Sequence, residues 1–181
     1  MRPDFDKIKA TEATVYLLNK GENSELYLIH ALKMLYIAER RALQRWGRSI
    51  TWDRFVSMDN GPVLSRTYNL MSGSDRSAEI WDRHISDRSN HKISIAEPLD
   101  PQKLSLAELK LLDEVFHEFG HVPRFDVCDH THKFPEWKDP DGSSLPIEIS
   151  EILKAADWTD EEIQELENEH ESRSTALRRL Y

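Results

Sequence analysis

The chain has 181 residues, a formal net charge of −9 at pH 7, 31% charged residues and 39% hydrophobic residues. This length predicts a single domain with its own core, and five Trp, five Tyr and six Phe argue against a disordered chain. The acidic balance disfavours nucleic acid as a partner, since a duplex binder needs a basic face to neutralise phosphates, and it suits a basic protein partner better.

Cysteine content and hydropathy favour a cytoplasmic protein. Cys128 is the single cysteine and cannot form an internal disulfide, which favours a reducing compartment. The first residues, MRPDFDKIKATEA, lack the apolar stretch of a signal peptide. The most apolar segment, residues 26–38, contains His30 and Lys33 and falls short of the roughly 20 residues that a membrane span needs. We therefore expect no contact with a membrane.

Two helices are expected in the first quarter of the chain. Asp4 or Asp6 could cap the first helix, and Gly21 ends it. The second helix is expected over residues 25–46, with Gly47 at its end. Its first half, LYLIHALKMLYIA, is apolar nearly all round, which is typical of a central buried helix.

The middle of the chain carries weaker signals. Gly61-Pro62 predicts the start of a short helix, because a proline in the first turn loses no hydrogen bond, and Gly73 ends that helix. Alternating isoleucines at 93–95 predict a small hairpin that pairs them with residues 84–85 and turns at Asn90.

The clearest helix begins at Ser105. Ser105 and Glu108 form a capping box, and apolar residues then recur at helical spacing up to Phe119. Gly120 and Pro123 end this helix.

The C-terminal region predicts two more helices. Pro146 could open a short one, and Thr159 with Glu162 forms a second capping box before a very charged last helix. Together the elements predict a mainly α fold, a single compact helical domain with one small β-hairpin.

The run HEFGH at 117–121 has the letters of a zinc-peptidase motif. In such enzymes His117 and His121 would bind zinc from one helix, and Glu118 would act as the base that activates the metal-bound water. Gly120 lies between the two histidines and Pro123 disfavours a helical residue before it, so His121 is expected at a helix end. We therefore favour a polar helix terminus and a non-enzymatic protein, with a zinc-dependent hydrolase as the alternative.

A second cluster, Cys128, Asp129, His130 and His132, contains residue types that bind zinc. Its spacing matches no structural zinc module, so a short capped turn with one buried histidine is the competing interpretation. Neither cluster calls for a cofactor. The chain also lacks a GxSxG nucleophile motif and a GxxxxGK[ST] phosphate loop.

Several motifs, taken in order, resemble the Panacea domain, the SocA-like antitoxin domain of bacteria and phages. They are LKMLYIAER at 32–40, GRSIT at 47–51, DRF at 53–55, GPV at 61–63 with Tyr68, LSLAEL at 104–109, a helix end at Phe119-Gly120, and Thr131-His132 followed by Trp137. Glu39 stands where the family more often has Asp, and Ser49 where it more often has Pro. The resemblance implies a Panacea-like helical domain over residues 1–140, with 141–181 as a helical extension packed on it.

The resemblance implies binding and no catalysis. Panacea domains are thought to neutralise a cognate toxin protein by direct contact, and one relative delivers its toxin to a AAA+ protease. A homo-oligomer is also compatible with this role. Polar and aromatic residues inside the family-like motifs are the candidate binding residues, although they could instead form an internal network. They are Arg40, Trp52, Asp53, Tyr68, His132 and Trp137.

Overall fold

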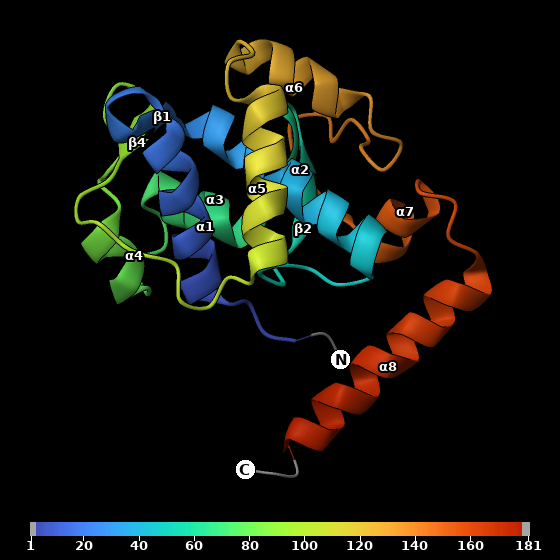
Figure 1. The fold of residues 1–181 in the computed structure, drawn as a ribbon. Coiled ribbons are helices and arrows are strands. Elements are labelled where there is room, and N and C mark those ends of the chain that lie inside the picture. The colour runs from blue at the N-terminus through green and yellow to red at the C-terminus, as the bar shows by residue number, and fades with distance from the viewer. Residues whose placement is uncertain (1–2, 179–181) are drawn as a thin grey trace.

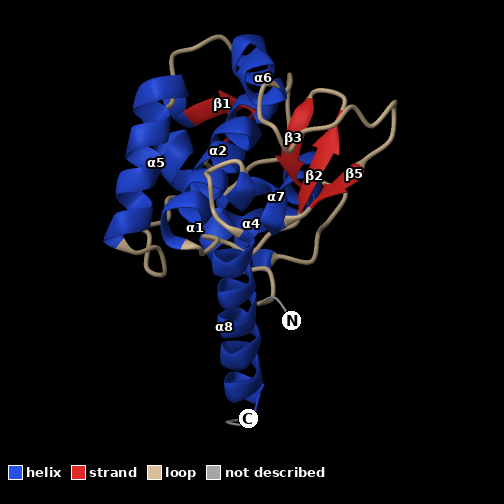
Figure 2. Ribbon diagram, turned by 90° about the vertical axis from the view of Figure 1, so that its right-hand side faces the viewer, coloured by secondary structure: helices blue, strands red, loops and turns tan. Residues whose placement is uncertain are grey.

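A computed structural model describes residues 3–178. The fold is mainly α, with eight helices in the described part of the chain and two small antiparallel sheets (Figures 1 and 2). The helices are α1 (Lys7–Lys20), α2 (Leu28–Trp46), α3 (Ser65–Ser72), α4 (Glu79–His84), α5 (Leu106–Phe119), α6 (Arg124–His132), α7 (Ile149–Lys154) and α8 (Asp160–Arg178). The strands are β1 (Glu25–Tyr27), β2 (Phe55–Met58), β3 (Gly61–Leu64), β4 (Lys92–Ser94) and β5 (Leu145–Ile147).

Helix α2 is the central element, as its apolar sequence predicts. It packs against α1, α5, α6, α7 and β3, and nearly every side chain from residue 30 to 39 is buried. Tyr36, at its middle, is fully buried and meets the ring of Phe55 edge-on at 5.7 Å. The first half of α2 is therefore the centre of the core, and the other elements pack around it.

Local capping signals mark the helix starts and ends. Asp6 accepts hydrogen bonds from two backbone N–H groups at the start of α1, and the Ser105–Glu108 box closes in both directions. Gly47 and Gly73 end α2 and α3 in the left-handed conformation. The predictions at these positions are confirmed.

The expected single hairpin is wrong, because the structure has two sheets. Strand β1 takes residues 25–27 out of the predicted helix and pairs them with β4. Ile85 does bridge Ile95, as predicted, but as an isolated bridge beside this sheet. Residues 25–27 form a strand because they pair with β4. That partner lies more than sixty positions later in the chain, so the local pattern did not reveal it.

The predicted helix start at Gly61-Pro62 is also wrong. These residues form β3, which pairs with β2, and α3 begins only at Ser65. Gly61 has φ +98°, and a Cβ there would lie 2.7 Å from the Thr131 hydroxyl and 2.9 Å from Lys33 Nζ. Glycine suits this crowded position with a positive φ, and the chain turns here from β2 into β3.

Residues after 140 are joined to the domain by a strand and a helix. Pro146, expected to start a helix, lies instead in β5, which pairs with the free edge of β2. Helix α7 packs on α2, whereas α8 extends away from the body in both views (Figures 1 and 2). Most of the described side chains of α8 are exposed, as its charged sequence predicts.

Candidate protein-binding site

A cleft of about 480 Å³ opens between the N-terminal ends of α2 and α6 and the β2–β3 turn. We call it the α2–α6 cleft. Tyr68 of α3, the loop carrying Arg88 and His91, and the loop at Gly142-Ser143 complete its walls. Its volume is in the usual range for ligand and side-chain binding sites.

The lining of the cleft combines apolar and charged side chains. Leu28, Leu32 and Val63 form the buried floor. Phe125 stands at the rim with 61% of its surface exposed, which is unusual for a phenylalanine. The charged residues at the cleft are Arg88, Arg124 and Asp59, and the His91 imidazole also lines it.

The predicted binding residues do not share one site. Tyr68 lines the α2–α6 cleft. His132 and Trp137 lie next to it and hold the β2–β3 turn: a ring nitrogen of His132 bonds the Asp59 carbonyl at 3.0 Å, and Trp137 Nε1 donates to the Met58 carbonyl at 3.0 Å. Their rings also meet at 4.5 Å. These two side chains therefore support the rim of the cleft from outside.

Asp53 is an internal residue. Its carboxylate accepts hydrogen bonds from the backbone N–H groups of Arg54, Arg66 and Thr67 and from the Thr67 hydroxyl. It thereby caps α3, because the N-cap residue of α3, Leu64, makes no side-chain hydrogen bond to the helix. Burial raises the pKa of this carboxyl, and the hydrogen bonds oppose that rise. The arrangement matches the internal network that the sequence left open.

Trp52 does not line this cleft. It adopts a left-handed backbone conformation with φ +58°, and its half-buried ring meets the ring of His170 edge-on at 4.9 Å. Its position links the loop after α2 to the protruding helix α8.

Arg40 belongs to a buried ion pair. Its Nε lies 2.6 Å from Glu136 Oε1, and its guanidinium stacks over the Phe134 ring at 4.1 Å. The Glu136 side chain is fully buried and also accepts a hydrogen bond from the Tyr36 hydroxyl. Arg40 supplies the positive charge that balances the buried Glu136 carboxylate, so it acts inside the fold.

Arg40→Met is therefore expected to lower the free energy of unfolding by about 3 kcal/mol, because Glu136 would remain buried with only the Tyr36 hydroxyl. Urea unfolding at pH 7 measures this loss. Arg45→Met is the matched control: Arg45 pairs with Glu114 on the surface, and the expected change is below about 0.5 kcal/mol. A fully stable Arg40→Met protein would contradict the internal role.

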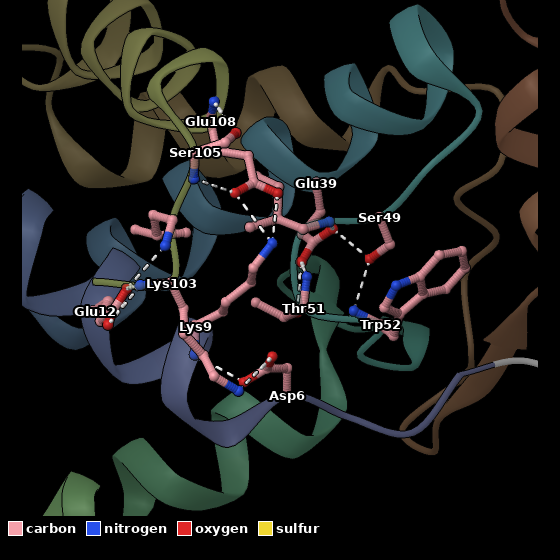
Figure 3. A network of polar contacts seen from close by, with 12 residues as sticks. Asp6, Lys9, Glu12, Glu39, Ser49, Thr51, Trp52, Lys103, Ser105 and Glu108 are labelled. Carbon is pink, nitrogen blue, oxygen red and sulfur yellow. Dashed lines mark hydrogen bonds and ion pairs between the residues drawn. The ribbon is translucent and has the colours of Figure 1, made fainter. Parts of the chain in front are cut away.

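Sequence reasoning missed the buried glutamates that hold loops in place (Figure 3). Glu39 accepts hydrogen bonds from the backbone N–H groups of Ile50 and Thr51 at 2.8 and 2.7 Å and from the hydroxyls of Ser49 and Thr51. Burial raises the pKa of Glu39, and these donors oppose the rise. Glu39 directly follows the apolar run that ends at Ala38, and a charged residue so close to this run is the signal that could have identified it.

Glu12 also binds the backbone of a loop, and Glu108 of the predicted capping box forms an additional ion pair. Glu12 accepts hydrogen bonds from three consecutive backbone N–H groups, those of residues 102–104. Glu108 accepts from the Ser105 N–H at 2.8 Å and pairs with Lys9 at 2.8 Å (Figure 3). Both carboxylates therefore have partners within the fold.

The HEFGH run is not assembled as a metal site. Helix α5 ends at Phe119, so His121 lies beyond it, as predicted, and packs edge-on against Phe116. Glu118, the supposed base, is 2.6 Å from Arg41. Among residues 3–176, no group of three or more His, Cys, Asp or Glu side chains could hold a metal ion.

The cluster at 128–132 lies in helix α6 and not in the short capped turn that was the competing interpretation. Its side chains diverge: His130 packs against Phe119 and Phe134, and His132 faces the β2–β3 turn. Cys128 is buried, and burial raises the pKa of its thiol.

Comparison with known proteins gives one match. The family model described as Antitoxin SocA-like, Panacea domain, matches residues 32–138, which is more than half of the chain. No curated protein and no solved structure matches the chain. The matched segment begins in α2 and ends just after Trp137, so it includes the α2–α6 cleft except for Leu28, Ile29 and the Gly142-Ser143 loop. No helix in the described part of the chain is both long and apolar enough to cross a bilayer.

Proposed function

We propose that this chain, which belongs to the SocA-like Panacea antitoxin family, neutralises a cognate toxin protein by direct contact in the cytoplasm. The family match is the observation that carries the proposal. Binding needs only a complementary surface, and the α2–α6 cleft with its exposed Phe125 offers one.

The charge of the molecule supports a protein partner. A net charge of −9 steers a basic partner toward the chain and speeds the encounter, whereas contacts in a buried pocket lengthen the lifetime of the complex. The buried acids described above all have partners within the fold, which suits a binding protein better than a hydrolase.

Co-expression with the product of the neighbouring gene tests the proposal. The toxin alone should arrest growth of the host cells, and co-expression of this chain should restore it. The two proteins should also elute as one complex in size-exclusion chromatography. Growth arrest that persists at equal expression levels, together with separate elution, would sink the proposal.

The steady-state level of the toxin separates direct neutralisation from delivery to a AAA+ protease. Masking leaves the toxin level unchanged while growth recovers. Delivery lowers the toxin level, and the decrease disappears in a host that lacks the protease. The same chromatography, with the chain alone, reports whether it forms a homo-oligomer.

A further inference from the structure

We propose that the α2–α6 cleft binds a segment of the toxin in which a carboxylate lies next to a bulky apolar side chain. This inference rests on the proposed function and adds the chemistry of the partner. The segment would place its apolar group on the Leu28–Val63 floor and its carboxylate between Arg88 and Arg124.

The Arg124 side chain is held in place by stacking but makes no hydrogen bond with the described residues. Its guanidinium stacks on the Tyr27 ring at 3.5 Å and lies 4.9 Å from the centre of the Phe125 ring. Its Nη1 is buried without a hydrogen-bond partner among the described residues. Stacking fixes the plane of a guanidinium whose donors have no acceptor, and buried donors are normally paired. A carboxylate is the acceptor whose geometry such a fork matches best.

Arg88 adds a second cation without a partner. Its exposed side chain forms no ion pair or hydrogen bond with any other residue between 3 and 176. Asp59 is the single carboxylate among the described residues lining the cleft, and its Oδ1 already accepts a hydrogen bond from the Gly142 N–H. Two unpaired arginines against one occupied carboxylate make the cleft locally cationic in a molecule of net charge −9.

The apolar part of the cleft accounts for the second half of the proposed segment. Leu28, Leu32 and Val63 are buried by the fold but still line the cleft. Phe125 extends this surface outward, and its exposed ring is a typical interface hot spot because aromatic side chains bury a large area on binding. A ligand that carried a charge and no apolar group would leave this apolar floor exposed to water.

N-acetyl-phenylalanine is a minimal probe, since it carries one carboxylate and one apolar ring. In an NMR titration of the full chain, it should shift the amide signals around Tyr68, His91 and Phe125. N-acetyl-phenylalaninamide, which lacks the charge, should bind about 10-fold more weakly. N-acetyl-aspartyl-phenylalaninamide tests a side-chain carboxylate against a terminal one. If neither charged probe shifts these signals, or if the neutral amide binds equally well, the proposal is wrong.

Variants test the same cleft with the toxin. Arg88→Glu combined with Phe125→Ala should weaken toxin binding by about 100-fold, because the pair removes a cation and an aromatic anchor. The matched control is Arg48→Glu combined with Leu106→Ala, which changes an exposed arginine and an exposed apolar residue elsewhere. Both proteins should keep the unfolding midpoint of the parent.

The outcomes separate this inference from the proposed function. If the parent neutralises the toxin and the cleft variant binds it as tightly as the control does, the cleft inference fails while the antitoxin role stands. If the parent does not neutralise the toxin, the proposed function fails, and the NMR titration alone then decides whether the cleft binds a carboxylate.

Discussion

Replacing Glu39 by alanine is expected to lower the free energy of unfolding by about 4 kcal/mol, a large part of the stability of a domain of this size. The carboxylate accepts four hydrogen bonds from residues 49–51, two of them from backbone N–H groups. Alanine would leave these donors buried without an acceptor, and each buried, unpaired donor costs about 1–3 kcal/mol. The loss exceeds that of an ordinary cavity because the loop that leads from α2 to β2 would lose its anchor.

Glu39→Gln sharpens this prediction. The N–H groups of Ile50 and Thr51 aim at different oxygens of the carboxylate, Oε2 and Oε1. An amide retains only one acceptor, so one backbone N–H must face an NH₂ group, and a loss of about 2 kcal/mol is expected. Urea unfolding monitored by tryptophan fluorescence measures both variants. Glu114→Ala, which removes an exposed glutamate on α5, serves as the control. Equal stability of all three variants would rule out the loop-anchoring role.

The elements that the sequence predicted correctly are those with local causes. Ser105 and Glu108 lie three residues apart and cap the same helix, and the apolar run of α2 needs no partner to mark it as buried. Gly47 ends α2 because it is left-handed, which is also a local property. Propensity and periodicity are sufficient for such elements.

The elements that were missed depend on residues distant in the chain. Gly61-Pro62 fits a helix start by local rules, but Gly61 is crowded by Thr131 and Lys33, so the chain continues as a strand. Pro146 pairs with Val56 of β2, which lies ninety positions earlier in the sequence. A pattern within one segment contains no information about such neighbours.

The same reason limits prediction of the site. Tyr68 was singled out and lines the cleft, but Arg88 and the Arg124-Phe125 pair were not, because they come from two segments far apart in the sequence. What distinguishes Arg124 is a buried nitrogen without a partner, and a sequence does not reveal which charges are paired. Asp53 and Arg40 were identified as important polar positions, and the structure places their partners inside the fold. Their part in binding stays a prediction.

Lys33→Met is expected to stabilise the protein at pH 7 and to lose that advantage at high pH. Lys33 is completely buried in α2, and its Nζ donates one hydrogen bond, at 2.8 Å, to the Pro62 carbonyl. Burial lowers the pKa of Lys33 from 10.5 to about 8. At pH 7 the folded protein therefore carries a buried charge that costs free energy, and a methionine of similar volume removes this cost.

The direction of the pH effect follows from proton uptake. Between pH 8 and 10.5 the unfolded chain holds a proton on Lys33 that the folded chain has released, so the stability of the parent rises with pH. From pH 7 to 9.5 this gain amounts to about 2 kcal/mol. Nearby Cys128 would favour the charged lysine as a thiolate, but burial raises the pKa of that thiol. The free energy of unfolding of the parent should therefore increase relative to that of Lys33→Met as the pH rises.

The measured quantity is the difference in unfolding free energy between Lys33→Met and the parent at several pH values, since groups common to both proteins cancel. The variant should be more stable by about 1 kcal/mol at pH 7, after the loss of the hydrogen bond to Pro62, and less stable than the parent at pH 9.5. Lys110→Met, at an exposed position of α5, is the control and is measured at the same pH values. A flat difference for Lys33→Met would mean that the buried amine keeps its ordinary pKa and stays charged up to pH 9.5, which would contradict the prediction.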